Sequence, residues 1–173
     1  MLRKAFIVAF ATVAAASAAQ ASDFQGPFVG AGATLDNVNG SGSLEGFGAA
    51  GVGGTAFAGY DLTVGGAFVG VEANADLNTA DALGVDAKWG WGASARAGFK
   101  INDSTGAYGR VGYQRSKIGA VGFGSDWGDG VRFGGGVETG LTDSTSLRVE
   151  FNHVNYEQDV INNQAVVGVV FGF

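Results

Sequence analysis

The sequence predicts an all-β fold, an eight-stranded antiparallel up-and-down transmembrane β-barrel. Two observations carry this prediction. In residues 164–173, bulky apolar side chains alternate with smaller ones and the segment ends on an aromatic residue, as in a strand that lies between lipid and a narrow lumen. In addition, no run of about 18 apolar residues follows the N-terminal leader. A chain that spans a membrane without such runs must close into a barrel, because lipid offers backbone polar groups no partner.

Residues 1–21 are predicted to form a signal peptide that is cleaved on export. Arg3 and Lys4 provide a basic start, and residues 5–16 are apolar but too few to cross a bilayer as a helix. Residues 19–21 then read Ala-Gln-Ala, which fits an A-x-A cleavage site. Residues 22–173 are expected to form one barrel domain, because no linker or shift in composition divides them.

The composition excludes several classes of protein. The chain has 32 Gly and 1 Pro, but its 46% of hydrophobic residues and 13 Phe oppose Gly-rich disorder. It has no cysteine, which excludes disulfides, thiolate nucleophiles and cysteine-based metal sites. The 16 acidic residues outnumber the 10 basic ones, which argues against nucleic acid as a partner.

Period-two alternation divides the domain into eight strands. They are expected over residues 27–35, 48–62, 66–77, 85–101, 107–118, 130–141, 145–155 and 164–173. In the first four, the positions that face outward include Val29, Ala31, Ala33, Leu35, Ala56, Ala58, Tyr60, Val69, Val71, Ala73, Ala75, Trp89, Trp91, Ala93, Ala95, Ala97 and Phe99. In the last four, they include Val111, Tyr113, Val131, Phe133, Val137, Leu147, Val149, Phe151, Val167, Val169 and Phe171.

The connections support the same fold. Tight turns are expected at residues 61–65, 102–106 and 142–144, and mostly longer loops at residues 36–46, 78–84, 119–129 and 156–160. Short turns at one end and longer loops at the other are typical of an outer-membrane barrel. The alternative is a soluble β-sandwich, whose second face would be solvated and rich in long polar side chains. Here that face is mostly Gly, Ala, Ser and Thr, which favours the barrel.

Because the apolar positions of each strand face outward, the alternate positions place a set of charged residues in the lumen. These are Glu72, Lys88, Arg96, Arg110, Arg132, Glu138, Arg148 and Glu150. An isolated charge near the middle of a membrane is costly, so such residues pair with one another or line water. Arginine is suited to this pairing, because its guanidinium binds a carboxylate with two parallel hydrogen bonds.

These charges also carry a resemblance to a known family. The hairpin from Gly54 to Leu77, the segment Ala95 to Phe99 and the segment Tyr108 to Gly112 resemble the transmembrane domain of outer membrane protein A and related small porin-like barrels. The spacing of ten residues between Glu138 and Arg148 is similar as well. The resemblance implies residence in the outer membrane after export through the periplasm.

The resemblance also implies a site inside the barrel. It assigns to the lumen an ion-pair network that blocks or gates a narrow water path, made of Glu72, Arg96, Arg110, Glu138, Arg148 and Glu150. Glu72 and Glu138 would be alternative partners for Arg148, with Arg96 competing for them. Phe173 would be the terminal signal that the barrel-assembly machinery recognises.

The function expected from these features is non-enzymatic. The chain would be a structural or surface protein of the outer membrane, in contact with lipid and lipopolysaccharide, monomeric, and without cofactor or metal. Its lumen either only rigidifies the barrel or conducts ions or small solutes through a narrow gated pore. An adhesin acting through the external loops is one alternative. A lipid-modifying enzyme is another, but it needs Ser and an acid beside a His, and no Ser is placed beside His153.

Several weaker motifs remain. Residues 46–51 fit G-x-G-x-x-G, but they lack the strand and helix that a dinucleotide site requires. Asp81, Asp86, Asp126 and Asp129 are candidate ligands for divalent cations at the external rim, although they lack a fixed spacing. Arg115 and Lys117 are candidate contacts for lipopolysaccharide phosphates, with solvent-exposed loop-end cations as the alternative.

Overall fold

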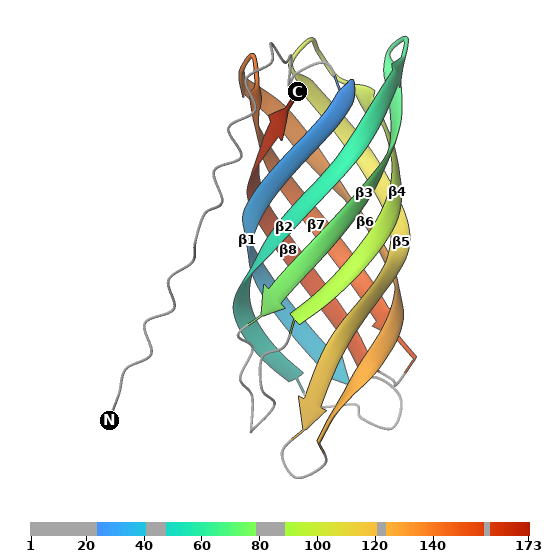
Figure 1. The fold of residues 1–173 in the computed structure, drawn as a ribbon, viewed down its shortest axis with the longest axis vertical. Helices are drawn as coiled ribbons and strands as arrows, with labels where there is room; N and C mark the ends of the chain where they lie inside the picture. The colour runs from blue at the N-terminus through green and yellow to red at the C-terminus, as the bar shows by residue number, and fades with distance from the viewer. Residues whose placement is uncertain (1–23, 41–47, 79–88, 121–123, 158–159) are drawn as a thin grey trace, which may run out of the picture.

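The computed structural model describes residues 24–40, 48–78, 89–120, 124–157 and 160–173. In this part of the chain, eight antiparallel strands form a closed barrel in which each strand pairs with its neighbours in sequence (Figure 1). The strands are β1 (Gly26–Gly40), β2 (Gly48–Val64), β3 (Ala67–Asn78), β4 (Trp89–Lys100), β5 (Thr105–Ala120), β6 (Gly124–Thr142), β7 (Thr145–Tyr156) and β8 (Val160–Gly172). The prediction of an eight-stranded up-and-down barrel is therefore confirmed.

Pairing between β1 and β8 closes the barrel. Their register runs from Phe28 opposite Gly172 to Gly40 opposite Val160, so no sheet edge remains open along this seam. The tight connections β2–β3, β4–β5 and β6–β7 lie at the same end as the C-terminus, at the top of Figure 1. We call this end the short-turn mouth.

Several strands are longer than the alternation of apolar residues predicts. β5 and β6 continue to Ala120 and from Gly124, so the loop expected over residues 119–129 is wrong. β1 extends beyond residue 35, and β8 begins before residue 164. The reason is that a hydrogen-bonded ladder needs no apolar face where it leaves the membrane. The expected start of β4 at residue 85, and with it Lys88, lies outside the described residues.

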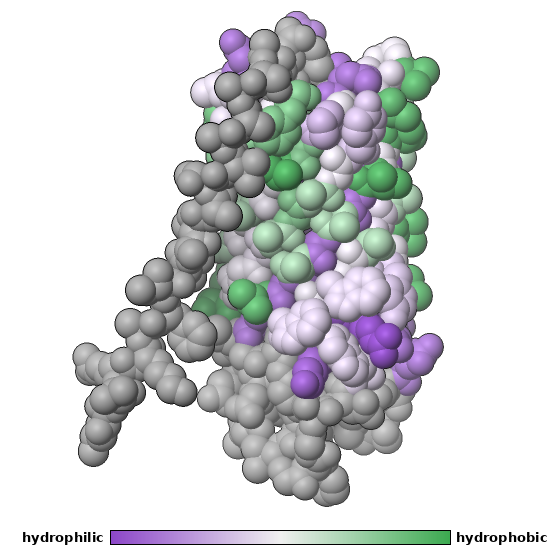
Figure 2. Space-filling model, in the orientation of Figure 1, coloured by the Kyte–Doolittle hydropathy of each residue, from purple (hydrophilic) through white to green (hydrophobic). Residues whose placement is uncertain are grey.

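The outward side of the strands is apolar, as predicted. Large hydrophobic side chains such as Leu35, Val71 and Leu77 are more than half exposed on the barrel surface. In Figure 2, green, apolar residues cover much of the middle of the visible face, and purple, hydrophilic residues lie at its ends and in places between them. This distribution fits a barrel whose middle band meets lipid. No helix in the described ranges is long and apolar enough to cross a membrane.

Small residues on the inward side make room for the charged side chains. At Gly70, an added Cβ would lie 1.9 Å from Oδ1 of Asp61 and 2.7 Å from the backbone oxygen of Tyr60. The first distance is far below a normal contact, and the backbone oxygen cannot easily move away. A glycine is therefore required here by space.

We expect Gly70→Ala to destabilise the folded barrel by about 1–3 kcal/mol, the usual cost of overpacking a filled interior. The measurement is the urea midpoint of the refolded protein, followed by the gel-mobility difference between folded and unfolded barrel. Gly66→Ala is the matched control, because an added Cβ at Gly66 meets no atom within 4 Å. Equal midpoints for the two variants would contradict the packing argument.

Candidate functional site: the charged network in the lumen

Six charged side chains from five consecutive strands meet inside the barrel, each at most 6% exposed. They are Glu72 on β3, Arg96 on β4, Arg110 on β5, Glu138 on β6, and Arg148 and Glu150 on β7. Their strands place them there because all six occupy inward positions of the alternating pattern. The register brings them to similar depths, with Arg96 opposite Arg110 and Glu138 opposite Arg148.

Arg148 lies at the centre of this group and is 1% exposed. Its Nη1 donates to Oε2 of Glu72 at 2.6 Å, while Nε and Nη2 donate to Oε2 of Glu138 at 3.1 and 3.0 Å. The guanidinium carbon also lies 4.2 Å from the centroid of the Phe57 ring, within the range of a cation–π contact. Glu72 and Glu138 thus bind Arg148 at the same time, rather than one in place of the other.

Glu72 also joins Arg148 to Arg110. Its Oε1 accepts a hydrogen bond from Arg110 Nη1 at 2.8 Å, and the same nitrogen donates to Oε1 of Glu150 at 2.8 Å. The hydroxyl of Tyr108 donates to the other oxygen of Glu150. Each carboxylate oxygen of Glu72 therefore serves a different arginine, so a movement of Arg148 would also change the environment of Arg110.

Arg96 is bound to a residue that the sequence analysis missed. Asp61, on β2, accepts from Arg96 Nε at 2.8 Å and also from Nη2, which gives a two-point pair. The remaining nitrogen, Nη1, makes no hydrogen bond and lies 3.7 Å from Oε2 of Glu72 and 3.6 Å from Oε2 of Glu138. Asp61 therefore holds Arg96 beside the carboxylates that bind Arg148.

A second group of polar residues lies toward the long-loop end. Arg132 Nη2 donates to Oδ2 of Asp76 at 2.9 Å, and the side-chain amides of Gln114 and Asn74 donate to the same oxygen, each at 2.9 Å. Arg132 was expected to face inward, whereas Asp76 was not identified. Its inward position follows from the alternation around Ala75 and Leu77, so the signal was present in the sequence.

Asp36 is a third carboxylate that the sequence analysis missed. It was assigned to a loop, but it lies in β1 and is 3% exposed. It accepts hydrogen bonds from Thr34 at 2.7 Å, Asn162 at 2.8 Å and Gln164 at 3.0 Å. No cation is within ion-pair distance of it among the described residues, so neutral donors alone satisfy its charge.

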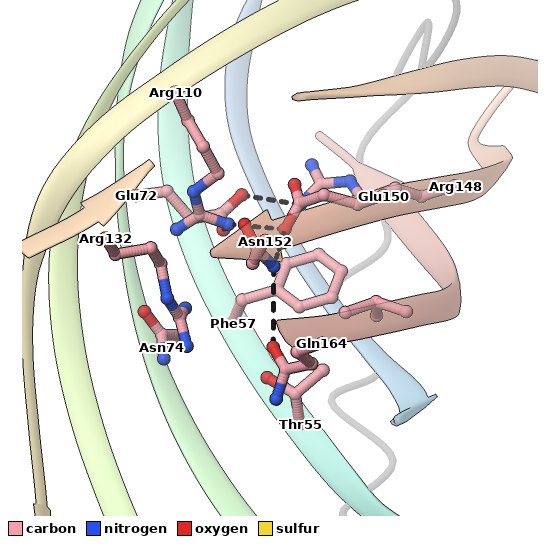
Figure 3. Close-up of a pocket in the computed structure, with 11 residues that line it drawn as sticks. Thr55, Phe57, Glu72, Asn74, Arg110, Arg132, Arg148, Glu150, Asn152 and Gln164 are labelled. Carbon is pink, nitrogen blue, oxygen red and sulfur yellow. Dashed lines mark hydrogen bonds and ion pairs between the residues drawn. The ribbon is translucent and has the colours of Figure 1, made fainter. Parts of the chain in front are cut away.

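A small cavity connects the two groups of polar residues (Figure 3). Its volume is about 10 Å³, which is room for about one water molecule. Asn74 and Arg132 line it from one group, and Arg110 and Glu150 from the other. A cavity this small is in line with a barrel of eight strands, whose interior is just wide enough for side chains to fill.

The chain matches the family profile described as "Outer membrane protein beta-barrel domain" over residues 6–173. The protein belongs to this outer-membrane β-barrel family. No curated protein sequence matches it. Membership agrees with the resemblance drawn from the sequence and places this outer-membrane barrel in the cell outer membrane.

Solved structures of other outer-membrane proteins share the fold. The attachment invasion locus protein Ail of Yersinia pestis is 16% identical, with 86% of this chain and 99% of that chain covered and a TM-score of 0.61. Neisserial surface protein A is 21% identical, with coverages of 86% and 98% and a TM-score of 0.62. The N-terminal barrel of Pseudomonas aeruginosa OprF is 14% identical, with coverages of 86% and 98% and a TM-score of 0.57. At these identities, the likeness concerns the fold.

Among the described residues of this outer-membrane barrel, the other candidate positions do not gather into a site. His153 faces outward, where its Nδ1 is 2.8 Å from Oδ1 of Asn163 and its ring packs on Phe133. Arg115 is close to Asp129, with Nε 3.3 Å from Oδ1. Within the described ranges, no group of three or more His, Cys, Asp or Glu residues could hold a metal ion.

Other candidate positions lie wholly or partly outside the described residues. Asp81 and Asp86 lie outside the described residues, and so do the first two residues of the glycine motif at 46–51. The side chain of Asp126 is also not described, although its backbone belongs to β6. The signal peptide expected over residues 1–21 likewise lies outside the described part of the chain.

We expect Asp61→Asn to destabilise the barrel by about 3–5 kcal/mol, because it leaves the buried Arg96 charge without its two-point partner. Urea unfolding of the refolded protein measures this. Asp143→Asn is the control: it removes the same charge from the exposed β6–β7 turn and should leave the midpoint unchanged. A similar small shift in both variants would show that Arg96 does not depend on Asp61.

Proposed function

We propose that this protein is a non-enzymatic outer-membrane barrel with a narrow ion path that is closed by its internal network. The observation that carries the proposal is the binding of Arg148 by Glu72 and Glu138 at the centre of the lumen. Five strands contribute to this network, and its six charged side chains are buried inside the lumen. Opening the path requires that Arg148 leave at least one carboxylate.

The positions of the neighbouring charges support such a movement. Arg96 Nη1 is within 3.7 Å of both carboxylates that bind Arg148, and it has no hydrogen bond of its own. Arg96 therefore supplies a second positive charge for Glu72 or Glu138 when Arg148 moves. A carboxylate with two available cations avoids the cost of an unpaired buried charge during the exchange.

The proposal includes the absence of catalysis. An enzyme acting on lipid needs a nucleophile and a base within hydrogen-bond reach of each other. His153 bonds to Asn163 and packs on Phe133, which gives the imidazole a structural role in the described region. The surroundings proposed for the protein are outer-membrane lipid and lipopolysaccharide, and the proposed state is a monomer inserted by the barrel-assembly machinery through Phe173.

Planar-bilayer recordings of the refolded protein test the path. Arg148→Ala removes the central guanidinium and leaves space in the lumen, so we expect a higher conductance than for the unmodified protein. Glu138→Gln keeps the shape but weakens one side of the Arg148 pair, so we expect more frequent openings of smaller size. Arg115→Ala is the control, because it removes a cation from the outer surface near the rim.

If the Arg148→Ala protein folds and its conductance equals that of Arg115→Ala, the proposed ion path is refuted. The network would then only fill and rigidify the lumen. Folding is checked independently by the gel-mobility shift of the intact barrel, so a loss of insertion is not mistaken for a closed pore. Glu138→Gln serves as the second test if Arg148→Ala does not fold.

A further inference from the structure

Three aromatic rings form a layer inside the barrel near the short-turn mouth. Phe24, Phe68 and Tyr108 form one buried cluster, with exposures of 4%, 1% and 6%. The rings of Phe24 and Phe68 stack with their centroids 4.4 Å apart, and Phe68 meets Tyr108 edge-on at 6.4 Å. Phe68 and Tyr108 belong to β3 and β5, whereas Phe24 precedes β1 and belongs to no strand.

Phe24 and Gln25 form a short arm that is fastened to the end of β2. Thr63 Oγ1 donates to the backbone oxygen of Phe24 at 2.8 Å, and the Thr63 backbone N–H donates to Oε1 of Gln25 at 2.8 Å. Phe24 has a φ of 49°, a left-handed conformation that is unfavourable for a bulky residue. Such a conformation persists only where surrounding contacts impose it. Here these contacts are the packing of the Phe24 ring and the hydrogen bonds from Thr63.

The barrel leaves a space for the ring. An added Cβ at Gly106, on β5, would lie 2.7 Å from Cζ of Phe24. The absence of a side chain at this position therefore admits the ring between β3 and β5. The barrel itself does not depend on the arm, because the pairing of β1 with β2 and β8 starts at Gly26 and Phe28.

The ring layer lies next to the charged network. The guanidinium carbon of Arg96 is 5.5 Å from the ring centroid of Phe68 and 4.8 Å from that of Tyr108. An ion entering from the short-turn mouth would therefore meet the aromatic layer before the Arg96–Asp61 pair. The rings of Phe24 and Phe68 offer an ion no hydrogen bond in place of its hydration shell, so they form a barrier in addition to the ion pairs.

We propose that Phe24 is a removable stopper of the short-turn mouth, carried on the arm and placed in series with the ion-pair network. The inference rests on the proposed ion path. Two of the three rings are fixed in strands, so only Phe24 can leave without breaking the barrel. Gly26 follows the arm and has a φ of 96°. Because glycine adopts positive and negative φ about equally well, rotation at Gly26 would move the arm away and open the layer.

Phe24→Cys tests the stopper in bilayer recordings, because the chain has no other cysteine. The recordings are made in the Glu138→Gln background, in which the network is weakened. We expect Phe24→Cys to raise the conductance several-fold. Benzyl methanethiosulfonate then attaches a benzylthio group to the thiol through a disulfide and releases methanesulfinate. The restored ring should return the conductance to the Glu138→Gln level, and dithiothreitol should raise it again.

Phe99→Cys in the same background is the matched control. Phe99 lies on β4 near the same mouth but faces outward and is 59% exposed. Neither the substitution nor the reagent should change the conductance there. If Phe24→Cys behaves like Phe99→Cys in a background that conducts, Phe24 is no barrier and the stopper is wrong.

Amide hydrogen exchange at Thr63 measures whether the arm is docked, and it does not require the protein to conduct ions. The amide should exchange slowly in the unmodified protein and faster in Phe24→Ala, which loses the ring. Gly106→Ala should also accelerate it, because the added Cβ displaces the ring from its space, whereas Gly66→Ala should not. Equal exchange in all four proteins would overturn the stopper. Protection that depends on Phe24, with no conductance in any variant, would refute the ion path and with it the stopper, and would leave only the docking of the arm.

Discussion

A guanidinium buried in a lumen this narrow must be matched by carboxylates, and this requirement organises the interior of the barrel. Arg148 is the strictest case, since it is 1% exposed and its ion-pair partners come from β3 and β6. Because Glu72 is shared with Arg110, the two arginines cannot be placed independently. The inward glycines follow from the same requirement, as Gly70 does beside Asp61. The fold provides the strands, and the space taken by the paired charged side chains decides which inward positions must be small residues.

The sequence predicts the barrel well because one constraint repeats in every strand. Lipid on one side and a crowded lumen on the other impose a period of two, so parity alone assigns Glu72, Glu138 and Arg148 to the inside. The same parity also assigns Asp61 and Asp76 to the inside. Asp61 was assigned to a turn, where Asp is common, whereas Asp76 was placed within a predicted strand and was not identified. Asp36 was missed because the apolar alternation of β1 stops before the strand does. The role of Phe24 has no periodic signal at all, since it comes from a residue outside the strands that folds back against β2, β3 and β5.

The lumen is asymmetric along its axis, and this asymmetry bears on how it works. Toward the short-turn mouth, aromatic rings cover the Arg96–Asp61 pair. Toward the long-loop end, Arg132, side-chain amides and the Thr34 hydroxyl donate hydrogen bonds to Asp76 or Asp36 in the described part of the lumen. These polar side chains can exchange hydrogen bonds with water, whereas the rings of Phe24 and Phe68 cannot. In the proposed ion path, the network would therefore be approached past polar side chains from one side and past apolar rings from the other.

The balance of charges decides which species such a lumen would favour. Among the described residues, the buried acids are Asp36, Asp61, Glu72, Asp76, Glu138 and Glu150, and the buried bases are Arg96, Arg110, Arg132 and Arg148. The acids outnumber the bases in both groups of described residues. In the centre, Asp61, Glu72, Glu138 and Glu150 face three arginines, and toward the long-loop end Asp36 and Asp76 face Arg132 alone. A surplus of carboxylates in a low-dielectric lumen attracts cations and repels anions. If Arg148 leaves its partners, one more positive charge is displaced from the constriction and the local potential becomes more negative. In the proposed ion path, the movement of Arg148 that opens the lumen would thus also make it more selective for cations.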